Sequence, residues 1–189
     1  MTTTDLIAET CLTCGAHFTA HDCTESACAL KQRPADPDPK LGRIWRAGSV
    51  RRWHTNPHLA HTVDTLDGHC ARVARIIMNL WPDDRDAIQG ALIHDDGEHV
   101  IGDIPATHPK SRAQTLTEAA IIYDLWGQQP LGGLSGERLK FADKLDAHLW
   151  ARHHAPHTLT GDGWPEARAW LETESRRLGV EDEVLGVLA

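Results

Sequence analysis

The stretch ALIHDDGEHVIGDIP, residues 91–105, places two histidines, three aspartates and a glutamate directly after an apolar segment. Ionisable side chains beside a hydrophobic core are costly unless each is hydrogen bonded, ion paired or bound to a metal. The chain must therefore fold so that other elements bring partners to this stretch. These residues are the first place to look for a functional site.

The surrounding sequence predicts helices. The clearest spans residues 64–81 and stops at Pro82. Its apolar residues at helical spacing are Leu66, Cys70, Val73, Ile77 and Leu80. Residues 83–96 begin with acids suited to a helix N-terminus, and we expect this helix to end at Gly97. Further amphipathic helices are expected at residues 113–127, 136–154 and 165–179.

The absence of strand patterns sets the fold class. No alternation of apolar and polar residues extends beyond four positions, and the sequence contains no internal repeat. The region from residue 41 to 189 is therefore predicted to be all-α and to form one domain. Its helices must pack against one another to bury their apolar faces.

Four polar residues on the predicted helices could surround one ion: His69, His94, Asp95 and Asp143. If the helices that carry them pack together, two imidazoles and two carboxylates meet. Such mixed ligands suit Mn, Fe, Co, Ni or Zn and leave coordination positions for water and substrate. An incomplete shell of this kind is typical of hydrolytic centres, because the ion lowers the pKa of bound water.

The order of these residues resembles that of a known family. The pattern H…HD…D is similar to that of the HD-domain metal-dependent phosphohydrolases, which are helical bundles. The fuller order adds Arg52-Trp53 upstream, Glu98 in HDxxE, Asp103 in GDIP, and Lys110. This set resembles the 5'-deoxynucleotidase branch and the related phage enzymes that remove triphosphate from dATP. The resemblance covers residues 43 to about 155.

The resemblance implies a role for each residue of the set. The metal ligands would be His69, His94, Asp95 and Asp143. Glu98 would orient or deprotonate the attacking water. The alternative for this residue is an exposed glutamate in a polar turn. Asp103 would lie near the sugar or the leaving 5'-oxygen, or would simply cap the turn before Pro105.

Three further residues are candidates for binding the substrate. Arg52 could hold a phosphate through its guanidinium, and Trp53 could stack on a base or sugar. Lys110 offers a second phosphate contact. The alternatives are a core position for Trp53 and a solvated surface charge for Lys110.

The expected function is therefore hydrolysis of 2'-deoxynucleotide 5'-phosphates to a nucleoside and phosphate. One alternative is a dNTP triphosphohydrolase of the dATP type, which would release a deoxynucleoside and triphosphate. Another is a non-catalytic HD-fold module that binds nucleotides or regulates a partner. A third is a nucleic-acid processing protein in which a zinc knuckle grips a strand.

A separate cysteine-rich segment precedes this region. Residues 1–30 contain Cys11, Cys14, Cys23 and Cys28, and the proline-rich residues 31–40 are typical of a linker. The CxxC spacing predicts a structural zinc site with four thiolate ligands, with His17 or His21 as possible replacements. A redox CxxC is the main alternative, but no βαβ pattern accompanies it.

Composition limits the partners. The formal net charge is -8, with 27 acidic against 19 basic residues, which argues against binding a nucleic acid polymer through its phosphates. No run of eighteen apolar residues and no signal peptide are present, so we expect a soluble, cytoplasmic protein without a membrane partner. The partner expected from the site is a small nucleotide, and the family resemblance suggests a homodimer or a higher homo-oligomer.

Overall fold

The computed structural model describes residues 9–10, 17–18, 38–104, 110–161 and 163–188. These residues are mostly helical, which confirms the predicted all-α class for the region after residue 40. The α-helices are α2 (Lys40–Gly48), α3 (Leu66–Leu80), α4 (Arg85–Ala91), α5 (Glu98–Ile101), α6 (Arg112–Trp126), α7 (Gly133–His154), α8 (Trp164–Arg177) and α9 (Glu181–Leu188). Two short 3-10 helices, η1 and η2, span Ala60–Thr62 and Pro156–Thr160.

The N-terminal part adds two very short strands. Strand β1 (Glu9–Thr10) pairs antiparallel with strand β2 (His17–Phe18). The four cysteines predicted to bind zinc lie outside the described residues, as does most of the expected linker. The zinc site therefore stays a prediction. None of the described helices combines the length and the apolar character that a membrane span requires.

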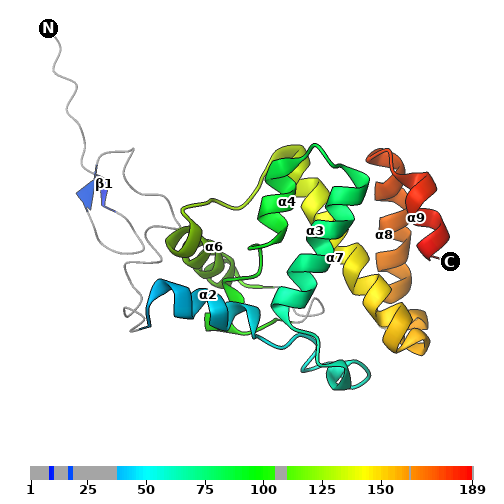
Figure 1. Ribbon diagram of the computed structural model, residues 1–189, viewed down its shortest axis with the longest axis horizontal. Coiled ribbons are helices and arrows are strands. Elements are labelled where there is room, and N and C mark those ends of the chain that lie inside the picture. The colour runs from blue at the N-terminus through cyan, green and yellow to red at the C-terminus, as the bar shows by residue number, and fades with distance from the viewer. Residues whose placement is uncertain (1–8, 11–16, 19–37, 105–109, 162, 189) are drawn as a thin grey trace, which may run out of the picture.

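The core forms where α3, α4 and α7 pack together, and α8 and α9 lie on the far side of α7 from α4 (Figure 1). The apolar stripe predicted on α3 is buried at Leu66, Cys70, Val73 and Ile77. From α7, Phe141 and Leu145 meet this stripe. Because α3 and the turns after α4 carry the predicted ligands, this packing brings the polar residues of both to one place.

The helix predicted over residues 83–96 is shorter than expected. Asp84 caps its start by accepting a hydrogen bond from the backbone N–H of Ala87 at 3.0 Å. The helix ends at Ala91, because the Ala91 carbonyl accepts a hydrogen bond from Nδ1 of His94 at 2.9 Å. That carbonyl is the one that a continuing helix would offer to the N–H of Asp95. His94 and Asp95 thus lie in the turns after the helix, rather than on it.

Gly97 allows the chain after these turns to approach α6 closely. A Cβ at this position would lie 2.8 Å from Cα and 3.0 Å from the backbone O of Glu118. Gly97→Ala is therefore expected to push α6 away and to cost about 1–3 kcal/mol of unfolding free energy, as overpacking does. Urea denaturation measures this loss of unfolding free energy. Gly161→Ala is the control, because nothing lies within 4 Å of a Cβ there, and equal stabilities of the two variants would refute the close approach.

Candidate metal centre

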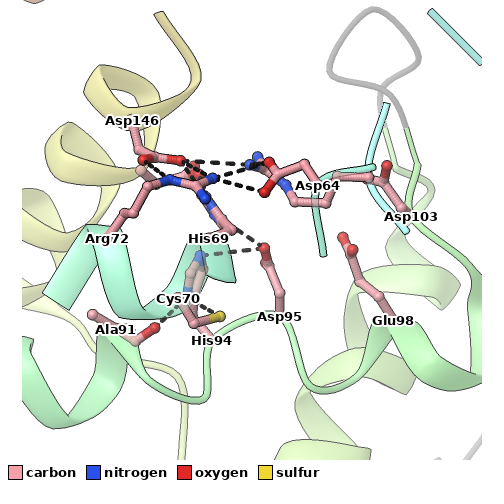
Figure 2. Close-up of polar contacts among 12 residues, drawn as sticks. Asp64, His69, Cys70, Arg72, Ala91, His94, Asp95, Glu98, Asp103 and Asp146 are labelled. Carbon is pink, nitrogen blue, oxygen red and sulfur yellow. Dashed lines mark hydrogen bonds and ion pairs between the residues drawn. The ribbon is translucent and has the colours of Figure 1, made fainter. Parts of the chain in front are cut away.

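Three of the four predicted ligands meet in one compact group (Figure 2). His69 comes from α3, while His94 and Asp95 come from the turns that follow α4. One ligand atom from each lies within 4.8 Å of the other two. The Oδ2 atom of Asp95 is 3.5 Å from Nε2 of His69 and 3.3 Å from Nε2 of His94. These separations are close to the spacing of neighbouring ligand atoms around a single ion.

Hydrogen bonds orient both imidazoles toward this group. Nδ1 of His69 donates to Oδ2 of Asp146 at 2.7 Å, and Nδ1 of His94 donates to the Ala91 carbonyl. With the ring proton on Nδ1, each Nε2 presents a lone pair, as a metal ligand must. Both Nε2 atoms are buried and make no hydrogen bond within the described part of the chain. This arrangement fits a divalent cation held by two histidines and an aspartate.

The fourth predicted ligand, Asp143, approaches the group from α7. Its Oδ1 atom lies 3.2 Å from Nε2 of His69, but it does not belong to the compact group of three. Its side chain is 37% exposed, more than that of Asp95 at 19%. The structure therefore places Asp143 next to one ligand, and its direct ligation stays a prediction.

The local charges favour a cation. Burial lowers the pKa of His69, but the carboxylates of Asp143, Asp146 and Asp95 together raise it to about 10. Burial also opposes the charge on Asp95, yet the positive charges of His94, His69 and Arg52 hold the pKa of that carboxyl below its ordinary value. Several carboxylates around one imidazole require a compensating positive charge. Either a proton or a divalent metal can supply it.

A buried ion network behind His69 was not predicted from the sequence. Arg72 donates through Nε to Oδ1 of Asp146 at 2.7 Å and through Nη2 to Oδ2 of Asp64 at 2.9 Å. Asp146 and Asp64 are 3% and 2% exposed. The spacing in the sequence did indicate these partners, because Arg72 follows His69 by three residues and Asp146 follows Asp143 by three. Residues three apart on a helix lie on the same face.

Asp146 positions His69, and its replacement tests this role. In Asp146→Asn the amide can present its NH₂ to Nδ1, which favours the wrong imidazole tautomer. We expect Mn²⁺ affinity to fall by about 10- to 100-fold, as measured by titration calorimetry on metal-free protein. Asp124→Asn is the control, because that carboxylate pairs with Arg43 on the surface. Unchanged affinity in folded Asp146→Asn protein would show that Asp146 does not orient the ligand.

Glu98 lies at the start of α5, close to the metal group. It is 5% exposed, and its Oε2 atom is buried without a hydrogen bond among the described residues. Nζ of Lys110 binds its other oxygen, Oε1, at 3.1 Å and also pairs with Glu118. Burial and the nearby charges of Asp95 and Asp103 raise the pKa of Glu98 to about 9, although Lys110 opposes this. A bound cation would favour the ionised form.

The predicted substrate residues Arg52, Trp53 and Asp103 lie together. The backbone N–H of Trp53, a residue with a φ of 63°, donates to Oδ2 of Asp103 at 3.2 Å. Nη1 of Arg52 lies 3.3 Å from Oδ2 of Asp64. The Trp53 ring stacks on Trp164 with centroids 6.2 Å apart. Asp103 thus holds the backbone at Trp53, and the ring packs within the protein. The predicted contacts of these residues with substrate stay predictions.

Asp96, in the middle of the acidic stretch, has a structural partner. Its Oδ2 atom accepts a hydrogen bond from Nε1 of Trp126 at 2.7 Å, which ties the end of α6 to the turns after α4. Burial raises the pKa of this carboxyl to about 6.

Comparisons of the chain with known protein families, curated proteins and solved structures find no match.

Proposed function

We propose that the protein is a metal-dependent phosphohydrolase that acts on 2'-deoxynucleotide 5'-monophosphates. One observation carries this proposal: the imidazoles of His69 and His94 present to the carboxylate of Asp95 buried Nε2 atoms that make no hydrogen bond among the described residues. The order of the site residues, which resembles that of the HD-domain phosphohydrolases, gives the substrate class. His69, His94 and Asp95 would hold the ion, with Asp143 as the fourth ligand.

The residues around the group have distinct tasks in this reaction. When bound, a divalent ion supplies positive charge that polarises a phosphoryl group and lowers the pKa of water. Glu98, whose buried Oε2 atom makes no hydrogen bond within the described ranges, would accept a proton from the attacking water as the water oxygen bonds to phosphorus. The bond from phosphorus to the 5'-oxygen then breaks. That oxygen takes up the proton that Glu98 accepted, and the products are a deoxynucleoside and inorganic phosphate.

The charges near the site favour a monophosphate over a triphosphate substrate. Arg52, Arg72 and Lys110 are already paired with carboxylates, and the ammonium of Lys140, beside the adjoining cavity, lies against the ring of Trp170. A triphosphate would have to break several of these ion pairs to find partners for its additional charges. A single phosphate needs fewer cationic side chains, because the bound metal ion itself compensates much of the phosphate charge.

A substrate panel tests the proposal. Protein loaded with Mn²⁺ or Co²⁺ is incubated with dNMPs, NMPs and dNTPs, and the products are separated by chromatography. Inorganic phosphate from dNMPs that disappears on chelation is the expected result. Triphosphate release from a dNTP would support the triphosphohydrolase alternative. Nucleotide binding without turnover of any ester, with metal bound, would support the non-catalytic module and refute the proposal.

A further inference from the structure

A cavity of about 260 Å³ adjoins the metal group. His94 and Asp143, two of the predicted ligands, form part of its wall. The remainder comes from α4 and the turn after it, from α6, from α7, and from the segment that joins α6 to α7. A molecule whose phosphate lies at the metal group could therefore extend directly into this cavity.

The wall of the cavity is largely apolar. Ile93, Ile122 and Leu131 contribute aliphatic surface. The nearby ammonium group, on Lys140, lies 5.6 Å from the centre of the Trp170 ring, where that indole can interact with it. A volume near the lower end of ligand pockets, about 300 Å³, suits one small planar group. An apolar wall does not suit a chain of further phosphates.

Two residues of the wall carry carboxamides, Gln128 and Gln129, and Gln128 also lines a neighbouring cavity between α2, α3 and α4. Neither side chain makes a hydrogen bond to another residue in the ranges that the structure describes. A carboxamide carries both a donor and an acceptor, and it pairs with the hydrogen-bonding edge of a nucleobase. The two amides are therefore available to a ligand that combines a flat apolar face with a polar edge.

A close backbone contact holds the segment that carries Gln128 and Gln129. A Cβ on Gly136 of α7 would lie 2.6 Å from the backbone O of Leu131, so only glycine permits this contact. The close approach fixes the backbone two residues after Gln129. The amides thus stand on a supported segment of the wall, as a built binding site requires.

The ring of Trp53, the other predicted site for stacking of a base, already contacts other side chains. The Trp53 ring stacks on Trp164, its Nε1 donates to Oδ2 of Asp64 at 3.2 Å, and the Arg52 guanidinium lies 5.1 Å from the ring centre. A base could stack on this indole only after these contacts were rearranged. The cavity beside His94 offers a site without that cost.

We infer that this cavity binds the nucleobase of the substrate, and that Gln128 and Gln129 recognise the base edge. The inference rests on the proposed function and extends it, because it requires a nucleotide with a base rather than any sugar phosphate. The aliphatic residues contact the faces of the base. The phosphate lies at the group formed by His69, His94 and Asp95.

The double variant Gln128→Leu/Gln129→Leu tests the inference in two measurements. For protein with Mn²⁺, kcat/KM is compared between dNMPs and 2-deoxyribose 5-phosphate, which has no base. We expect the double variant to lose about tenfold or more for dNMPs, mainly through KM, with unchanged hydrolysis of the sugar phosphate. Binding of 2'-deoxynucleosides to the metal-free protein, measured by equilibrium dialysis, should weaken similarly.

Gln89→Leu is the matched control, because Gln89 and Gln128 both line a neighbouring cavity to which neither His94 nor Asp143 contributes, so this variant tests whether a loss arises there instead. It should behave as the wild type in both measurements. The inference is overturned if the double variant keeps the wild-type ratio and nucleoside affinity. Nucleosides that bind through the amides while no ester is hydrolysed would refute the proposed function alone. Hydrolysis without base preference or nucleoside binding would refute the inference alone.

Discussion

Glu98→Gln is expected to lower kcat for dNMP hydrolysis by about 10²- to 10⁴-fold, the contribution of a positioned general base. The substitution preserves the size of the side chain but replaces the carboxylate, which can accept a proton, with an amide, which cannot. Glu98 is buried beside Asp95 and has one oxygen without a hydrogen-bond partner among the described residues. The measurement is release of inorganic phosphate under single-turnover conditions, with metal content determined on the same samples.

Metal content separates two explanations for a loss of activity. Glu98 is not in the ligand group, so the variant should bind Mn²⁺ with wild-type stoichiometry. Glu172→Gln, on α8, makes the same change in a surface residue that pairs with Arg168, and it should retain full activity. If Glu98→Gln keeps more than half of the wild-type rate, another group must activate the water.

His94→Ala is expected to abolish metal binding at micromolar ion concentrations and, with it, all metal-dependent turnover. Without His94, the proposed site keeps one imidazole, that of His69, beside the carboxylates of Asp95 and Asp143, a ligand set that holds a transition metal less firmly. The change also frees the Ala91 carbonyl, which then competes for the N–H of Asp95 and can extend α4. Calorimetric titration with Mn²⁺ measures the first effect.

The control for this variant is His153→Ala, an exposed residue near the end of α7. It removes an imidazole from the surface, and both metal binding and turnover should match the wild type. Full metal affinity in His94→Ala would mean that the ion binds elsewhere. Activity without any metal in that variant would contradict the proposed chemistry as a whole.

Much of the fold follows from helical periodicity. A stripe of five apolar residues predicted α3: Leu66, Cys70, Val73 and Ile77 are buried, and Leu80 is half-buried. Once α3, α4 and α7 bury their apolar faces against one another, His69 and the residues after α4 must meet. The convergence of His69, His94 and Asp95 could therefore be predicted without knowing the angles between the helices.

Other features depend on contacts that periodicity does not reveal. Helix α4 ends at Ala91 because Nδ1 of His94 donates to the Ala91 carbonyl in place of the backbone N–H of Asp95. Sequence composition does not show which of these two donors binds the carbonyl. The partnership of Arg72 with Asp146 joins residues 74 apart in sequence, so it appears only after α3 and α7 have packed. Helix α9 was not predicted, although its buried Val184 and Leu188 are spaced by one helical turn.

Anomalous diffraction from crystals grown with Mn²⁺ would show whether His69, His94 and Asp95 hold a divalent ion. Manganese prefers nitrogen and oxygen ligands over thiolates, so the cysteine-rich segment should not compete for it. We expect one strong anomalous peak within coordination distance of Nε2 of His69, Nε2 of His94 and a carboxylate oxygen of Asp95. A map with no peak among these three atoms at millimolar Mn²⁺, or with its strongest peak elsewhere, would contradict it.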